Sequence, residues 1–195
     1  LDTGMHARVV SYSLKPFTLI GATTRAGLLT GALRSRFGIV HNLRFYDDNE
    51  LTDILVQAAN KLENVNINRD ALHTIASRSR GTPRIALRLL RRVRDYADVR
   101  CDGNFDADVV NAALTLEGID EVGMDALDRT YMETIAQTYE GGPVGVDAVA
   151  ASMGEDAGTL QDVVEPYLLQ AGFLARTRQG RKITTSGRQL LDSAT

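Results

Sequence analysis

The spacing of apolar side chains changes along the chain and predicts different elements in its successive parts. Residues 8–14 alternate between apolar and polar positions, which predicts a half-buried strand or hairpin arm. Residues 17–22 form a continuous apolar run, as in a central strand covered on both faces. We expect a short helix over residues 28–36 and another strand over residues 39–45. The first part of the chain therefore predicts a piece of an α/β sheet.

From Asp48 onward apolar residues recur with the period of an amphipathic helix, which predicts a small helical bundle without strands. The third helix has the clearest beginning. Gly81 interrupts the preceding pattern, Thr82 offers a side-chain oxygen as N-cap, and Pro83 takes the first helical position. The expected helices cover about 49–62, 70–79, 83–97 and 107–116.

The last part of the chain predicts a winged helix, a variant of the helix-turn-helix. Helical patterns come first, followed by two short strand patterns around a polar turn at residues 177–180. The helices are expected over 124–139, 146–153 and 157–170, and the strands over 173–176 and 181–184. The predicted fold is mainly α, with an α/β remnant over 1–46, a helical bundle over 47–120 and the winged helix over 121–195.

Composition narrows the function classes. With 44% hydrophobic and 24% charged residues the chain is typical of a globular protein, and its apolar runs are too short to cross a membrane. The single cysteine, Cys101, excludes an internal disulfide framework and is typical of a cytoplasmic protein. Cys101 and the three scattered histidines lack metal-ligand spacing, so we expect no metal site in this chain.

The net charge of −3 hides two basic stretches. Residues 1–46 carry six Lys or Arg against one acid, and residues 166–191 carry five basic residues and no acid. Such patches attract phosphate groups, whatever the overall charge. A solvated basic face accounts for the same distribution.

Three short segments carry candidate chemistry. Thr23 and Thr24 follow the apolar run of residues 17–22, at the sheet edge where α/β folds bind ligands. Two threonines at this position are equally typical of the end of a strand that binds no ligand. Arg36, after a short helix, has the side chain suited to phosphate oxygens. Arg84 is a cation in the first turn of a helix, where it opposes the helix dipole, and this favours an external anion as its partner.

Together these segments resemble the RuvB family, a class of AAA+ ring motors that move Holliday junctions in DNA recombination and repair. The resemblance is carried by ordered blocks: FTLIGATTRAGLLTGALRSRFGIV, LRFYDD, RGTPRIALRLLRRVRDYA, GGPVGVDAVAASMGE and VEPYLLQAGFLARTRQGR. It implies that residues 1–46 belong to an AAA+ core and residues 47–120 to its helical lid.

The resemblance also implies a role for particular residues. Thr24 matches the first sensor of the γ-phosphate, and Arg36 matches the arginine finger that enters the neighbouring subunit's site. Tyr46 matches an aromatic contact to the nucleotide base, and Arg84 matches the second sensor. The wing residues that contact DNA correspond to Arg176 and Arg181.

The same family implies cofactors and partners: ATP and Mg²⁺, Holliday-junction and duplex DNA, further copies in a hexameric ring, and a RuvA-type protein, with a RuvC-type resolvase as a further candidate. Residues 4–8 resemble the arm that docks RuvA, here shortened and altered. The family often carries a basic residue near Ala157, which is absent here.

No GxxxxGK[ST] phosphate loop and no strand ending in Asp-Glu occur in the sequence. We interpret the chain as a fragment of an ATPase subunit, with the Mg²⁺ ligands outside it, and expect no ATP hydrolysis by it alone. A non-enzymatic winged-helix DNA-binding module is the alternative. It accounts for residues 122–188 but not for the GATTR, LRSRFG and GTPR segments.

Overall fold

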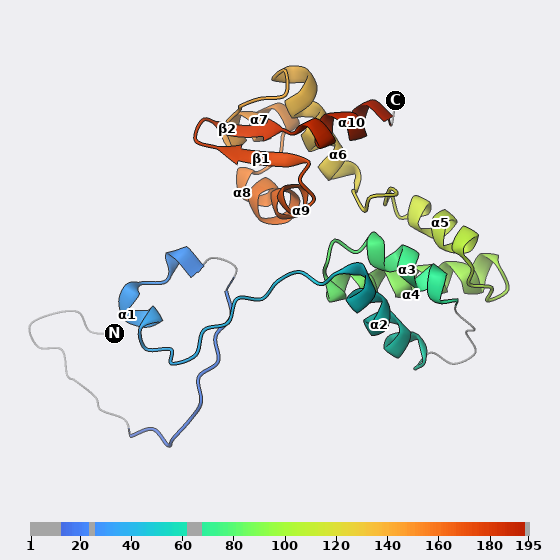
Figure 1. The fold of residues 1–195 in the computed structure, drawn as a ribbon, viewed down its shortest axis with the longest axis horizontal. Helices are drawn as coiled ribbons and strands as arrows, with labels where there is room; N and C mark the ends of the chain where they lie inside the picture. The colour runs from blue at the N-terminus through green and yellow to red at the C-terminus, as the bar shows by residue number, and fades with distance from the viewer. Residues whose placement is uncertain (1–12, 24–25, 62–67, 194–195) are drawn as a thin grey trace, which may run out of the picture. The chain divides into compact units, whose positions relative to one another are not determined.

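The computed structural model describes residues 13–23, 26–61 and 68–193, and this part of the chain is mainly helical (Figure 1). The chain divides into two units, residues 1–43 and residues 44–195. Thr24, the arm at residues 4–8 and nearly all of the expected strand at 8–14 lie outside the described residues.

The described part of the first unit is extended backbone interrupted by two short helical turns. These are η1 (Ala26–Leu28) and α1 (Gly31–Arg34), of which only α1 lies wholly within residues 28–36, where the sequence predicts a helix. Thr30 caps α1 by accepting a hydrogen bond of 3.3 Å from the amide of Leu33. Gly21 lies close to the ring of Phe37, because a Cβ on Gly21 would stand 3.4 Å from it.

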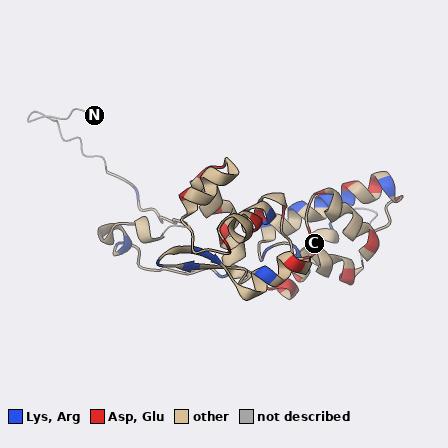
Figure 2. Cartoon of the chain, turned by 90° about the horizontal axis from the view of Figure 1, so that it is seen from above, with Lys and Arg blue, Asp and Glu red and all other residues tan. Residues whose placement is uncertain are grey.

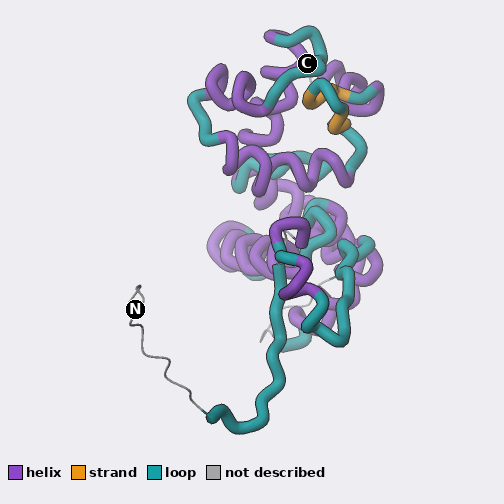
Figure 3. The backbone as a smooth tube through the Cα atoms, turned by 90° about the vertical axis from the view of Figure 1, so that its left-hand side faces the viewer, coloured by secondary structure: helices purple, strands orange, loops and turns teal. Residues whose placement is uncertain are grey.

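The strands expected over 17–22 and 39–45 are not formed. Both segments are extended, but no strand pairs with them among residues 13–23 and 26–61, and their apolar side chains are exposed. A β-strand requires a ladder of hydrogen bonds to a neighbouring strand. An extended apolar segment that has no neighbouring strand is therefore not a β-strand. Within the described residues, Figure 3 shows strand only in the hairpin near the C-terminus.

The second unit begins with a helical bundle that matches the predicted one closely. Its helices are α2 (Asp48–Ala59), α3 (Arg69–Ser77), α4 (Pro83–Arg100) and α5 (Ala107–Leu116). Asp47 and Glu50 form a reciprocal capping box that fixes the start of α2. Leu51, Ile75 and Leu89 are among the fully buried side chains of its core.

The winged helix follows with its own core, which includes the fully buried Tyr131, Ile135 and Leu168. Its elements are α6 (Ala126–Glu133), η2 (Thr134–Thr138), α7 (Val146–Met153), α8 (Ala157–Thr159), η3 (Leu160–Val164), α9 (Glu165–Gln170), β1 (Leu174–Thr177), β2 (Gly180–Ile183) and α10 (Thr185–Ser193). The predicted mainly helical fold with a C-terminal winged helix is confirmed.

Three details of this domain differ from the sequence-based prediction. The helix expected over 124–139 ends in the π-helical turn η2. The helix expected over 157–170 is divided by the π-helical turn η3. Pro166 lacks an amide hydrogen and its ring crowds the preceding turn, which opposes regular α-helical bonding there. A closing helix, α10, also follows the hairpin, and its beginning is capped by Thr184, whose hydroxyl oxygen accepts a hydrogen bond of 3.0 Å from the amide of Gly187.

Candidate functional site

Arg36, the candidate arginine finger, is exposed just after α1. Its neighbour Arg34 is used locally, since it donates a hydrogen bond of 2.6 Å to the carbonyl oxygen of Ala26. Arg36 forms no ion pair with any carboxylate in the described part of the chain. No carboxylate of the described residues therefore neutralises its guanidinium.

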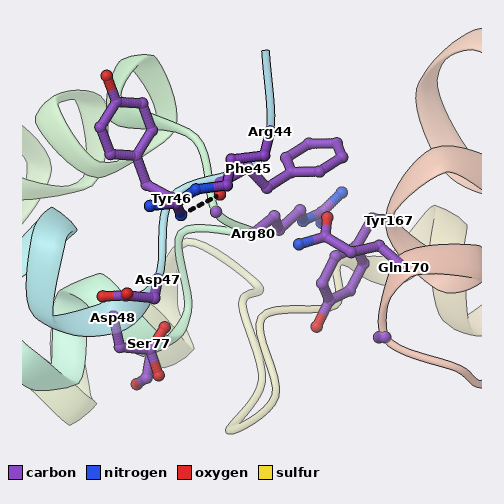
Figure 4. A pocket seen from close by; sticks show the side chains of 11 residues that line it. Arg44, Phe45, Tyr46, Asp47, Asp48, Ser77, Arg80, Tyr167 and Gln170 are labelled. Atoms are coloured by element: carbon purple, nitrogen blue, oxygen red, sulfur yellow. Dashed lines mark hydrogen bonds between the residues drawn. The ribbon is translucent and has the colours of Figure 1, made fainter. Parts of the chain in front are cut away.

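Tyr46, the candidate contact to a nucleotide base, lies beside the turn that leads into α4. Its amide donates a hydrogen bond of 2.9 Å to the carbonyl oxygen of Gly81, drawn as the dashed line in Figure 4. In that view the Tyr46 ring points away from Arg80 and Tyr167. Tyr46 is one of the residues around an open cavity of about 460 Å³, whose lining also includes Phe45, Ser77, Arg80, Tyr167 and Gln170.

Arg84, the candidate second sensor, is exposed in the first turn of α4, a turn that contains no acidic residue. Among the described residues it forms no ion pair. The hydrogen bond from Tyr46 to Gly81 brings that tyrosine close in space to the turn preceding Arg84. An unpaired cation at a helix N-terminus is suited to binding phosphate oxygens.

The side-chain cap predicted at Thr82 is not formed. Thr82 is the N-cap residue of α4, and Pro83 takes the first helical position as expected, but the Thr82 hydroxyl makes no cap bond. It donates instead to the carbonyl oxygen of Arg80, at 3.2 Å. The left-handed backbone at Arg80 and Gly81, with φ of 54° and 64°, turns that carbonyl toward the hydroxyl.

The wing candidates Arg176 and Arg181 face each other across β1 and β2. Blue colouring in Figure 2 marks the Lys and Arg residues on both strands. Both arginines bind one carboxylate, that of Glu165 at the start of α9. Arg176 Nε lies 3.0 Å from Glu165 Oε2, and Arg181 Nε lies 2.8 Å from Oε1.

This pairing corrects the expectation of an un-neutralised basic wing. The sequence has no acid between residues 166 and 191, but Glu165 stands immediately before that interval and is fully buried beneath the hairpin. The side chain of Arg181 is only 16% exposed and that of Arg176 is 50% exposed. Arg181 is thus mainly a structural partner of Glu165, whereas Arg176 keeps half of its surface for another contact.

Hydrogen bonding holds Glu165 in its ionised form despite its burial. Burial acts to raise the pKa of Glu165, but hydrogen bonds from Arg181, Arg176 and Tyr131 outweigh it and lower that pKa below its ordinary value. The Tyr131 hydroxyl donates to Oε1 at 2.8 Å, and burial together with this bond raises the pKa of Tyr131. The carboxylate therefore stays charged at neutral pH with its lone pairs satisfied.

The backbone of Arg181 is held as firmly as its side chain. Its amide donates to the carbonyl oxygen of Val144 at 2.7 Å, and its own carbonyl accepts from the Val144 amide at 2.9 Å. Gly180 permits this approach, because a Cβ there would stand 2.3 Å from the Val144 oxygen and its φ is 137°. The hairpin is thus joined to Val144 of the domain core by backbone hydrogen bonds as well as to Glu165 by the Arg181 side chain.

Two other cations of the wing remain exposed. Arg178 in the turn and Lys182 on β2 form no ion pair within the described residues. In the sequence both belong to the basic stretch, but nothing there distinguishes them as contacts. Which cations of the stretch are exposed and unpaired depends on burial and on ion pairing, and neither can be predicted from charge alone.

Neither a metal cluster nor a membrane-spanning helix is present in the described ranges. No group of three or more His, Cys, Asp or Glu side chains in these residues is arranged to hold a metal ion. None of their helices combines the length and the apolar character needed to cross a membrane.

The sequence matches three family models in the order of the chain. Residues 1–43 match the Holliday junction DNA helicase RuvB P-loop domain, residues 46–120 match the RuvB AAA lid domain, and residues 121–192 match the RuvB C-terminal winged helix domain.

Solved structures of similar proteins agree with these matches. The Thermotoga maritima RuvB Holliday junction branch migration motor is 51% identical, with a TM-score of 0.85. A single-substitution mutant of the same Thermotoga maritima protein gives the same identity and TM-score. The alignment covers 91% of this chain but 59% of that chain, so this sequence spans about three-fifths of its relative.

Proposed function

Since this chain belongs to the RuvB family, we propose that it supplies the sensor, lid and DNA-contacting parts of an ATP-driven DNA translocase that moves Holliday junctions. The observation that carries the proposal is the ordered match of the P-loop, lid and winged-helix segments. A non-enzymatic DNA-binding module accounts for residues 121–192 alone and leaves the first two matches unexplained.

The proposed nucleotide contact lies at the start of α4. Arg84 is exposed and unpaired among them, and Tyr46 is hydrogen-bonded to the same turn. We propose that Arg84 binds phosphate oxygens and Tyr46 contacts the base, with Thr24 as the first sensor. ATP, with Mg²⁺ held by ligands outside this chain, supplies the free energy for movement when it is hydrolysed.

Arg36 completes the proposed ATP site from the next subunit of a hexameric ring. An arginine acts in this way because its fixed charge stabilises negative charge that develops on the transferred phosphoryl group. We further propose a cytoplasmic location, a RuvA-type partner, and a RuvC-type resolvase as an additional partner.

Arg176, Arg178 and Lys182 form the proposed DNA contact of the wing, with Arg181 fixing the hairpin beneath them. Contacts to phosphate rather than to base edges suit a translocating protein, because they do not depend on sequence.

The test compares this chain with an intact subunit, in which the chain is joined to a phosphate-loop segment. We expect the intact subunit to hydrolyse ATP in a DNA-stimulated manner and to move a synthetic Holliday junction. The 195-residue chain should bind duplex DNA without hydrolysing ATP. An intact subunit that binds DNA but neither hydrolyses ATP nor moves junctions would favour the non-enzymatic module.

A further inference from the structure

Arg80 connects the helical bundle to the winged helix from the turn between α3 and α4. Its Nε donates a hydrogen bond of 2.8 Å to the carbonyl oxygen of Gly123. Its terminal nitrogen lies 3.0 Å from Asp125 Oδ2 and 2.7 Å from Asp128 Oδ2. The guanidinium also stacks 4.9 Å from the centroid of the Tyr167 ring, and Figure 4 shows the two side chains together.

These contacts are protected from water. The Arg80 side chain is 11% exposed and that of Asp128 is 1% exposed. Every partner of the guanidinium named above lies within residues 121–192, which match the winged-helix model, whereas Arg80 lies within the segment that matches the lid. The guanidinium of Arg80 thus connects the helical bundle to the winged helix.

The linker between α5 and α6, residues 117–125, is ordered by Asp120. One oxygen of Asp120 accepts hydrogen bonds from the amides of Val122, at 3.1 Å, and Met124, at 2.8 Å. Its other oxygen pairs with Arg129 of α6. The Tyr167 hydroxyl donates to the carbonyl oxygen of Val122. The linker is therefore fastened to the winged helix by contacts that do not involve the bundle.

The linker also packs directly on the turn that carries Arg80. A Cβ on Gly123, whose φ is 85°, would lie 2.8 Å from the carbonyl oxygen of Arg78. On its other side, the same turn continues through Gly81, which binds Tyr46, to Arg84. Arg80 is consequently placed between the candidate nucleotide contacts and the domain that carries the wing.

We infer that Arg80 is a positioning residue that transmits movement of the nucleotide-contacting turn to the winged helix, so that the state of the nucleotide alters the grip on DNA. This inference rests on the proposed function. A displacement of the turn carries the guanidinium with it, and the winged helix follows because the buried pair with Asp128 and the stacking on Tyr167 resist separation.

The first experiment measures the connection alone, in the 195-residue chain. Spin labels are placed at two exposed sites, Arg88→Cys on α4 and Gln189→Cys on α10, in a Cys101→Ser background. We expect Arg80→Gln to broaden the distance distribution between the labels. The matched control is Arg78→Gln, which removes an arginine bonded to Asn111 within the bundle and should leave the distribution narrow.

A second pair of variants examines the packing of the linker. Gly123→Ala should broaden the distribution, because its Cβ meets the Arg78 carbonyl. Gly103→Ala is the control: its φ of 76° imposes similar backbone strain, but nothing lies within 4 Å of the added Cβ. A distribution that stays narrow in both Arg80→Gln and Gly123→Ala overturns the inference.

The second experiment measures transmission in the intact subunit. Duplex DNA affinity is compared with a non-hydrolysable ATP analogue and with ADP bound. In Arg80→Gln we expect the ratio of the two affinities to fall toward one, a loss of roughly 5- to 150-fold, while analogue affinity is retained. Arg80→Lys should restore part of the ratio, because lysine keeps the positive charge but lacks the planar guanidinium that reaches several partners at once.

The possible results are distinguishable. A purely structural role would lower both DNA affinities and leave their ratio unchanged, which contradicts the inference. A wild-type subunit whose DNA affinity ignores the nucleotide contradicts both transmission by Arg80 and the proposed motor, whereas the label distances still report whether Arg80 joins the domains.

Discussion

Arg176 and Arg181 are direct cross-strand neighbours in the hairpin, and both bind the same carboxylate. Two cations placed opposite each other in a sheet normally repel. Here the buried Glu165 lies beneath them and compensates for that repulsion. The wing is therefore built around an ion triad, and changes to its members should affect the stability of the domain.

Replacing the shared carboxylate should destabilise the winged helix. Glu165→Gln leaves Arg181 largely buried without its counter-charge, and breaking a buried pair costs on the order of 3 kcal/mol. We expect urea unfolding to show this loss at pH 7. Arg178→Ala, at an exposed turn position, is the control and should change the stability by less than about 0.5 kcal/mol. Equal stability of the two variants would contradict the buried triad.

The exposed cations should account for binding to DNA without loss of fold. The double variant Arg178→Ala, Lys182→Ala is expected to weaken binding to any duplex by a similar factor. The slope of log K against log salt should flatten by about 0.9 for each phosphate that the variant no longer neutralises. Arg181→Ala alone should instead lower the unfolding free energy. An unchanged salt slope in the double variant excludes Arg178 and Lys182 as phosphate contacts.

Local patterns are sufficient to predict most helices of this chain. The predicted ranges 107–116 and 146–153 coincide with α5 and α7, because apolar period and capping residues act over a few positions. The predicted strands of the hairpin agree with β1 and β2 to within one residue at either end. Among the candidate sites, Arg36 and Arg84 are exposed, and their roles stay predictions.

Partnerships between distant residues could not be predicted from such patterns. Glu165 meets its arginines across 11 and 16 positions, and Arg80 meets Gly123 across 43. A charge count over residues 166–191 excludes Glu165 by a single position. The strands predicted at 17–22 and 39–45 are wrong for a related reason, since apolarity predicts burial but a strand also needs a paired neighbour.

Loss of the proposed finger should abolish hydrolysis in the intact subunit. Because Arg36 is exposed and unpaired among the described residues, Arg36→Ala should leave folding and ATP binding largely intact while lowering the ATPase rate by roughly 10³- to 10⁵-fold. Steady-state hydrolysis and nucleotide-binding measurements check this. Mixing Arg36→Ala subunits with phosphate-loop variants should restore some activity. Mixed rings that assemble but stay inactive would argue against action between subunits.

Asp128 should give the second unit an uncommon dependence of stability on pH. Burial raises the pKa of Asp128 to about 6, although the charge of Arg80 opposes this, and its Oδ1 is buried without a hydrogen-bond partner in the described part of the chain. In the unfolded chain an aspartate has a pKa of about 3.9. Between these two values the folded chain holds a proton that the unfolded chain has released.

The free energy of unfolding should therefore fall as pH rises from about 4 to about 6, and this contribution should be constant above that window. The contribution of Glu165 to the free energy of unfolding has the opposite sign, because folding lowers the pKa of Glu165. This contribution is lost only as pH falls below the pKa of an unfolded glutamate, about 4.3.

Asp128→Asn removes the Asp128 contribution while keeping a side chain of similar size. Its stability relative to wild type should increase with pH through the window from about 4 to about 6 and then level off. Urea unfolding at several pH values measures this, and the carboxyl ¹³C shift of Asp128 should titrate with a midpoint of about 6. Asp98→Asn, at an exposed position of α4, is the control and should give a flat difference. A flat difference for Asp128→Asn as well, with a titration midpoint near that of an unfolded aspartate, would show that burial beside Arg80 does not disfavour the charged carboxylate.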